Sequence, residues 1–281
     1  MITQHPYYVK KVSELKTKSG DPYLILDLIA IDRTHLKGVV WNPLTVVPED
    51  DKSIYENTAY IFVASEVTYK GEKQLVIEWA ERSDVDISVF MRLPVNDPDE
   101  LLSLLKQLLI DNVKTPAYRA IMKGFFLFDD DFFDKLKRLP RTTNYDFSYP
   151  GGLLQSIVYG VEFAIQTSNI LALPEASKEL IICSVLFADL GKIMELTFNF
   201  TKTEVGNLLG HQYLSCQLLE QIDRETDFAF LTDIMKIKHC ILTHHIDDVG
   251  NWSIVKTKLR EADLVKDIMQ LVFKNEEWNI K

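Results

Sequence analysis

The hydrophobic pattern of this chain changes once, and that change constrains the fold more than any other feature of the sequence. From residue 7 to about residue 90, short β-rich runs with alternating apolar residues are separated by turn signals, which is typical of strands. From Asp97 onward, apolar residues recur about every 3.6 positions, which is typical of helices packed on a core. The two parts meet at residues 93–100, which carry two prolines and end in a helix N-cap signature. We therefore expect two domains, which is also reasonable for 281 residues.

The first domain, residues 1–95, is expected to be a small β-barrel. Its clearest strands are expected at residues 23–29, 38–41, 60–64 and 74–79. About five short strands in some 85 residues suit a closed barrel. An antiparallel sheet packed on the second domain would give much the same pattern, so that alternative stays open at this point.

The second domain, residues 96–281, is expected to be all helical, with no parallel sheet. Its helices are expected at residues 98–111, 116–123, 130–138, 152–168, 175–189, 206–221, 228–244 and 255–275.

Composition narrows the classes of function. The charge sum of 31 basic and 41 acidic residues is −10, which excludes a strongly basic nucleic-acid coat. Three scattered cysteines predict reduced thiols rather than a disulfide framework. The sequence shows neither a signal peptide nor an apolar run of the roughly 18 residues that a membrane span requires. We therefore expect a cytoplasmic protein with no membrane partner.

Four short segments of the helical part are rich in polar residues without an obvious packing purpose. They lie at residues 149–154, 187–192, 206–211 and 242–245. Asp189, His211, His244 and Asp263 stand on separate predicted helices and could converge on a divalent metal, as ligands in helix bundles do. The alternative is structural, because a histidine pair at a helix end is more often a cap or a surface feature.

In order and wording, these segments resemble the YhaM-type 3′-5′ exoribonucleases, a family that joins an N-terminal OB-fold to a C-terminal HD domain. The family's motifs run Gly-Gly-Leu-Leu, His-Asp-Ile-Gly-Lys, Asn-Leu-Leu-Gly-His, His-His and Ala-Asp, and matching stretches occur here between Tyr149 and Asp263. In the strand-rich part, residues 16–24 and 32–41 are similar to the family's OB domain. The resemblance therefore implies an OB-like barrel followed by an all-α HD-type bundle.

The resemblance also implies roles for particular residues. Asp189 and Lys192 match catalytic positions of the family. The matching metal ligands are Asp189, His211, His244, His245 and Asp263.

Two ligand positions of the family are not filled by histidine in this chain. Gln155-Ser156 stands where the family has its first metal histidine, and Ala188 replaces the histidine of the His-Asp doublet. Two-metal hydrolysis needs one ion to lower the pKa of water and a second to neutralise charge on phosphate oxygens. We therefore expect at most one divalent ion, manganese or similar, or none, and we expect that Ser156→His and Ala188→His together would raise metal occupancy.

Two functions follow as hypotheses. The first is a catalytically weakened or inactive relative of the 3′-5′ exoribonucleases that binds single-stranded nucleic acid or a phosphorylated ligand. The alternative is an active metal-dependent phosphodiesterase, a 3′-5′ exonuclease on single-stranded RNA or DNA.

The barrel supplies candidates for contact with single-stranded RNA or DNA. OB-folds stack bases on aromatic side chains and follow the backbone with lysine or arginine. The candidates are Lys16, Lys18, Tyr23, Trp41 and Tyr69. Other aromatic residues should fill the barrel core, and we expect Tyr60 or Phe62 to do so.

Overall fold

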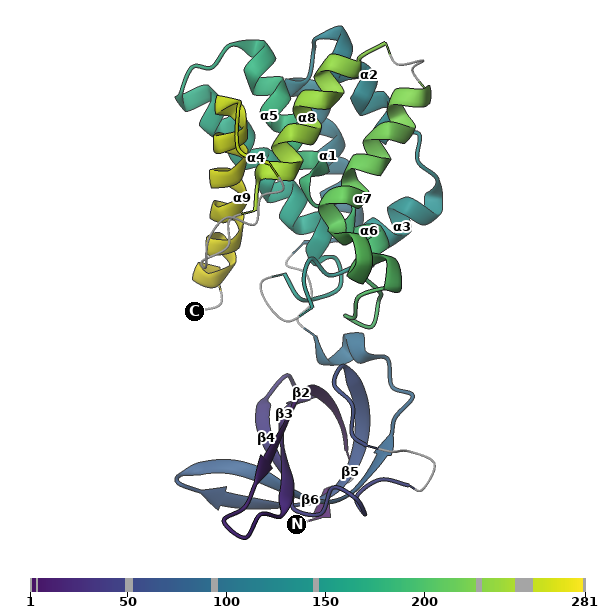
Figure 1. Cartoon of the computed structure of the whole chain (residues 1–281), viewed down its shortest axis with the longest axis vertical. Coiled ribbons are helices and arrows are strands. Elements are labelled where there is room, and N and C mark those ends of the chain that lie inside the picture. Colours follow the sequence, from purple (N-terminus) through teal and green to yellow (C-terminus); the bar gives the residue numbers. More distant parts are fainter. Residues whose placement is uncertain are drawn as a thin grey trace. The chain divides into compact units, whose positions relative to one another are not determined.

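The structure is a computed structural model, and it divides into two compact units, Met1–Arg92 and Leu93–Lys281. It describes residues 2–3, 5–48, 53–91, 96–143, 147–225, 229–245 and 255–279. Figure 1 shows arrows in the first unit and helices in the second, so the predicted change from strands to helices is confirmed.

The first unit is a closed barrel. Its strands are β1 (Ile2–Thr3), β2 (Pro6–Lys16), β3 (Pro22–Ala30), β4 (His35–Val40), β5 (Thr58–Tyr69) and β6 (Glu72–Arg82), followed by the 3-10 turn η1 (Ile87–Phe90). The five longer strands pair in the cyclic order β2-β3-β4-β6-β5-β2, with β4 and β6 parallel and the other pairs antiparallel. This order makes the barrel OB-like, and it rules out the open antiparallel sheet.

The barrel interior is filled by alternate residues of the strands. Tyr60 and Phe62 of β5 are fully buried, and their rings stack at 5.8 Å between centroids. Leu26 and Leu28 of β3 face the same interior. The prediction that Tyr60 or Phe62 fills the core is therefore confirmed for both residues.

The second unit is helical, and Figure 1 labels its helices. They are α1 (Pro98–Asn112), α2 (Pro116–Phe125), α3 (Asp130–Arg138), α4 (Gly152–Ile170), α5 (Glu175–Ala188), α6 (Lys192–Glu195), α7 (Glu204–Glu225), α8 (Leu231–Thr243) and α9 (Arg260–Asn279). The described residues of this unit form no parallel sheet.

Two helix predictions need correction. The last helix begins at Arg260 rather than at residue 255, and in the non-helical segment before it the backbone N–H of Lys258 donates to Nε2 of His239. The short helix α6 is absent from the predictions, since four residues are too few to show a helical period. Residues 226–228, where another predicted helix begins, lie outside the described residues.

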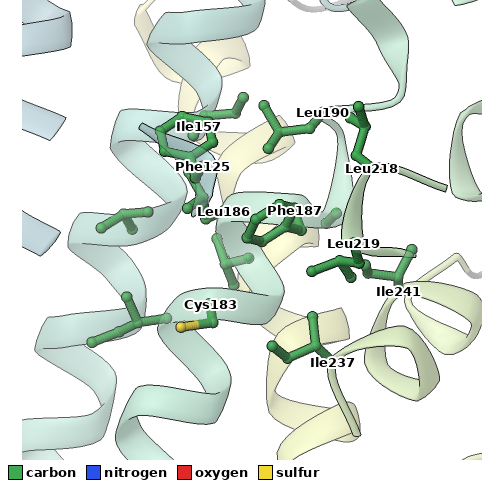
Figure 2. Packing of buried hydrophobic residues seen from close by; sticks show 14 of the residues in the cluster. Phe125, Ile157, Cys183, Leu186, Phe187, Leu190, Leu218, Leu219, Ile237 and Ile241 are labelled. Atoms are coloured by element: carbon green, nitrogen blue, oxygen red, sulfur yellow. The ribbon is translucent and has the colours of Figure 1, made fainter. Parts of the chain in front are cut away.

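Helix α5 runs through the middle of the hydrophobic core. Each of its residues from Glu179 to Ala188 is buried. Figure 2 shows Leu186 and Phe187 of α5 among side chains from other helices, including Leu219 of α7. Because this helix is enclosed on all sides, its C-terminal end is held in a fixed position.

Two features bear on the environment of the protein. Cys183, Cys216 and Cys240 are buried and free, as the sequence predicts. Among the described residues, no helix combines the length and the apolar character needed to cross a membrane.

Candidate metal centre and nucleic-acid surface

The fixed end of α5 positions Asp189, which is the C-cap residue of that helix and is buried. Two residues later, Gly191 lies against the backbone of α7: a Cβ at this position would come within 2.1 Å of the His211 carbonyl oxygen. The backbone N–H of Gly191 also donates to Oγ of Ser215, at 2.8 Å. The glycine therefore allows the chain segment that carries Asp189 to approach the one that carries His211.

Three histidines come together beside Asp189. Gly210 breaks α7 with a positive φ of 72°, so His211 begins a new helical segment. His244 is the C-cap of α8, and His245 follows it. One ring nitrogen from each of the three histidines lies within 4.8 Å of the others. We call His211, His244 and His245 the histidine trio.

A hydrogen bond orients the ring of His244, and a carboxylate lies against the ring of His211. Nδ1 of His244 donates to the Ile241 carbonyl oxygen at 2.6 Å, and Nε2 of the same ring is buried without a hydrogen-bond partner among the described residues. Nδ1 of His211 lies 3.1 Å from Oε2 of Glu195. A carboxylate or carbonyl on one ring nitrogen leaves the lone pair of the other nitrogen available to a metal. Nε2 of His211 in turn lies 2.8 Å from Nε2 of His245.

The trio is electrically neutral near pH 7. Burial lowers the pKa of His211 to about 4, with a further contribution from Lys192. Burial also lowers the pKa of His244 to about 4 and that of His245 to about 3. Neutral imidazole is the form that binds a metal, so the trio fits a divalent ion.

Asp189 is paired with an arginine that the motifs do not contain. Nε of Arg141 donates to Oδ2 of Asp189 at 2.7 Å, and both side chains are almost completely buried. The other carboxylate oxygen, Oδ1, lies 3.8 Å from Nζ of Lys192 and 3.6 Å from Nε2 of His211. Burial opposes the charge of Asp189, but Arg141 and then Lys192 hold its pKa well below the usual range. Asp189 is therefore a charged carboxylate that is already paired with a cation, the guanidinium of Arg141.

The positions that lack histidine offer no ring nitrogen, and their polar side chains are engaged elsewhere. Oγ of Ser156 donates to the Leu153 carbonyl at 2.8 Å, within its own helix, and Ala188 is fully buried. Gln155 is occupied by Tyr159, whose hydroxyl accepts its amide N–H at 2.8 Å. The residues present therefore fit one ion at the trio but do not fit a two-ion centre.

The structure brings together most of the predicted site residues of the helical part. Asp189 and Lys192 lie beside the trio, whereas Asp263 is exposed on the first turn of α9 and is not part of the cluster. The sequence did not reveal Glu195 or Arg141. The signal for Glu195 is only its spacing of three residues from Lys192, and Arg141 follows α3 without any periodic pattern.

Glu195 orients the trio, and this leads to a prediction. Its buried carboxylate contacts His211 on one oxygen and, at 2.7 Å, Nζ of Lys202 on the other. Carboxylates that orient a ligating histidine typically contribute 10- to 100-fold in metal affinity. We expect Glu195→Gln to weaken binding of zinc or manganese by about that factor in a calorimetric titration. Glu204→Gln, at an exposed acid on the first turn of α7, is the control, and equal affinities for the two variants would contradict this role.

On the barrel, four of the five predicted residues lie at one end, where the turn between β2 and β3 meets the end of β4. Tyr23 and Trp41 stack at 5.1 Å between ring centroids, and Trp41 is 51% exposed. Lys16 ends β2, directly beside β3, and Lys18 follows in the exposed turn between these strands. We call these four residues the Trp41 platform.

Tyr69 lies away from the Trp41 platform. It ends β5 and pairs with Glu72, the first residue of β6. Because β4 and β6 run parallel, with Lys37 opposite Gln74, Trp41 and the start of β6 are about six residues apart, or roughly 20 Å. Tyr69 is exposed, with Nζ of Lys70 at 5.4 Å from its ring centre.

A groove of about 630 Å³ opens near the Tyr69 end of the barrel. Its lining includes Lys10, Asp27, Thr34, His35, Lys37, Glu72 and Lys73. Lys37 is paired with Asp27, and Lys73 contacts Glu66 at 2.8 Å, so these cations are already partly neutralised. The Trp41 platform is therefore the stronger candidate for stacking a base.

An OB-like barrel joined to a helical unit with a buried cluster of imidazoles and carboxylates defines the structural class of this chain. Within that class, the chain is similar to curated proteins called 3′-5′ exoribonuclease YhaM. The protein from Listeria welshimeri is 25% identical over 261 residues, which cover 89% of this chain and 78% of the relative. Those from Listeria innocua and Listeria monocytogenes are 25% and 24% identical, over the same shares of each chain.

The chain is therefore similar to YhaM-type proteins over most of its length, and the resemblance carried by its motifs is confirmed. No family model matches the chain. No solved structure matches it either.

Proposed function

We propose that this protein binds single-stranded RNA through its OB-fold, over residues 1–95, and that its HD domain, over residues 96–281, has weakened or no exonuclease activity. The observation that carries the second half of the proposal is the buried ion pair of Arg141 and Asp189. By the resemblance, Asp189 matches a metal-ligating aspartate of the family. In this chain that carboxylate already has a guanidinium on one oxygen, and Ser156 and Ala188 stand at positions of lost ligands.

The same cluster supports binding of one divalent ion by the histidine trio. An ion bound there would lower the pKa of a water molecule and polarise a phosphate oxygen. Three imidazoles suit zinc better than manganese, which favours carboxylate and water ligands. Lys192, which lies beside Asp189, would contribute positive charge toward a phosphate.

RNA is the preferred partner because the relatives' names specify exoribonucleases. An RNA-binding role agrees with the expectation of a cytoplasmic protein.

An assay with end-labelled single strands tests this function. We expect the purified protein to slow the migration of a 5′-labelled RNA in a gel-shift experiment. With added manganese or zinc, the length of the RNA should stay unchanged or nearly so. A matching DNA strand, assayed in parallel, shows whether the protein selects RNA. No binding to either strand would overturn the proposal.

The second candidate is an active, metal-dependent 3′-5′ exonuclease. It is favoured by the convergence of three neutral imidazoles and by the activity named for the relatives. Processive shortening of the labelled RNA with added metal, abolished by His244→Gln, would establish this function in place of the first.

A prediction follows for the Trp41 platform. Stacking of a base on an aromatic side chain typically contributes about 1–3 kcal/mol. We expect Trp41→Ala to weaken RNA binding by about 5- to 150-fold, and the addition of Lys16→Ala and Lys18→Ala to weaken it further and reduce its salt dependence. Trp79→Ala is the matched control, because Trp79 is a partly exposed tryptophan on β6 of the same barrel. Equal losses in the two tryptophan variants would show that the platform is not the binding surface.

A further inference from the structure

Arg141 is unusual because it is a fully buried arginine in the helical unit, with 1% of its surface exposed. Its guanidinium carbon lies 3.6 Å from the centre of the Phe273 ring, a close cation–π contact. Nε donates to Asp189, whereas Nη1 is buried without a hydrogen-bond partner among the described residues. Burying a charged group with an unused donor costs free energy, so the groups around Arg141 must offset that cost.

The charge is required by the carboxylates around it. Asp189 and Glu195 are both buried and contribute two negative charges. Three cationic side chains contact them at distances of 2.7 to 3.9 Å: Arg141, Lys192 and Lys202. The cluster is thus neutralised without any metal ion, and a divalent ion at Asp189 would add charge to a site that already has a surplus of cations.

The geometry of Asp189 leads to the same conclusion. A carboxylate oxygen that ligates a transition metal lies about 2.0–2.2 Å from the ion. The Oδ2 atom has the Arg141 nitrogen at 2.7 Å, so a guanidinium N–H already occupies one of its lone pairs. The remaining oxygen, Oδ1, faces His211 and Lys192.

We propose that the guanidinium of Arg141 takes the place of a divalent ion at Asp189. It supplies the positive charge that keeps the buried carboxylate stable in the folded helical unit, and it confines any bound metal to the histidine trio. The stabilising role of the Arg141 charge concerns the metal-free protein and is independent of the proposed function. The confinement of a metal to the histidine trio rests on the one-ion centre of the proposed function.

The test is thermal unfolding of the full chain in the presence of a chelator, with the helical signal followed by circular dichroism. Arg141→Met removes the charge and keeps an elongated apolar side chain. We expect it to lower the Tm of the helical transition by about 10 °C, because an uncompensated buried charge is strongly destabilising. Arg138→Met is the matched control, since Arg138 also pairs with an aspartate, at 3.1 Å, and covers a phenylalanine ring, at 4.3 Å, but is exposed. We expect a shift of at most about 2 °C for this control.

A second substitution separates charge from packing. Adding Asp189→Asn to Arg141→Met removes both charges, and we expect most of the lost Tm to return. If the double variant is as unstable as Arg141→Met, or if neither variant folds, Arg141 acts by packing on Phe273 and the proposal is overturned. An Arg141→Met variant as stable as the Arg138→Met control would overturn it equally.

Metal completes the test. Manganese or zinc should raise the Tm of Arg141→Met much more than the Tm of the unmodified protein. In the double variant, which lacks the Asp189 carboxylate, the rise in Tm should be no larger than in the unmodified protein. Elemental analysis should show one more ion per chain in Arg141→Met combined with Ser156→His and Ala188→His than in the unmodified protein. If the metal content is unchanged, and if metal raises the Tm of Arg141→Met no more than that of the unmodified protein, the proposal that the guanidinium takes the place of an ion is overturned. None of these measurements uses RNA, so a failure of RNA binding is distinguishable from a failure of this inference.

Discussion

Replacing His244 with glutamine should abolish tight binding of a divalent ion, with a loss greater than the 10- to 100-fold typical of residues that only orient a ligand. His244 is buried, and its Nε2 is the nitrogen of the trio that has no hydrogen-bond partner among the described residues. Nδ1 is engaged by the Ile241 carbonyl, so the free nitrogen is the one available to an ion. Glutamine can keep a hydrogen bond to the backbone but offers no imidazole nitrogen.

The measurement is equilibrium dialysis with zinc, followed by elemental analysis. His239→Gln is the control, because His239 lies on the same helix α8 and accepts a backbone N–H from Lys258 at 2.9 Å, outside the trio. The control should keep the affinity of the unmodified protein. Equal zinc contents in the two variants would show that the trio does not hold the ion.

The second large effect is a loss of stability of the metal-free protein in mild acid. The pKa of His211 and of His244 is about 4 in the folded protein, below the ordinary value of 6.5. Between these two values the unfolded chain binds more protons than the folded protein, so the free energy of unfolding falls as the pH falls from about 6.5 toward 4. Each pKa unit corresponds to about 1.4 kcal/mol, and we expect a total loss of at least about 3 kcal/mol.

Urea unfolding at pH 7, 6 and 5, with a chelator present, measures this loss. Above about pH 5, ordinary carboxyl groups are still ionised, so they contribute little to the change. In His244→Gln the same change should be smaller, since one buried imidazole is removed. A free energy of unfolding that stays constant from pH 7 to pH 5 would contradict the neutral, buried state of the trio.

Much of the fold could be predicted from the sequence, because its signals are local. The periods of the apolar residues predict the barrel and the helices, and the prolines between residues 93 and 100 mark the change between them. Helix α6 and the non-helical residues 255–259 could not be predicted. The first is shorter than the period that would reveal it, and the second contains a contact between Lys258 and His239, which are 19 positions apart in the sequence.

The candidate site was predictable only in part. Motifs place Asp189 and the trio because these residues stand in a recognisable order. They show that Ser156 and Ala188 lack imidazoles, but not what compensates for the loss. Arg141 reaches Asp189 across 48 positions of sequence, and only the folded chain shows that contact.

This contact changes the expectation for restoring the lost ligands. On the sequence alone, Ser156→His and Ala188→His together should raise metal occupancy. Both positions are buried, and Arg141 already holds the carboxylate beside them. We therefore expect the restored pair to gain a second ion only when Arg141 is replaced as well.

The closure of the barrel has a consequence for recognition. Each of its five longer strands has a partner strand on both sides, so a ligand could add a strand of its own only beyond the short pairings, which are four residue pairs long between β2 and β5 and three between β4 and β6. Where the strands are paired on both sides, a partner must be recognised through side chains and the loops that join the strands. Affinity and selectivity can then change by single substitutions at exposed positions such as Trp41, while the backbone that supports them stays the same.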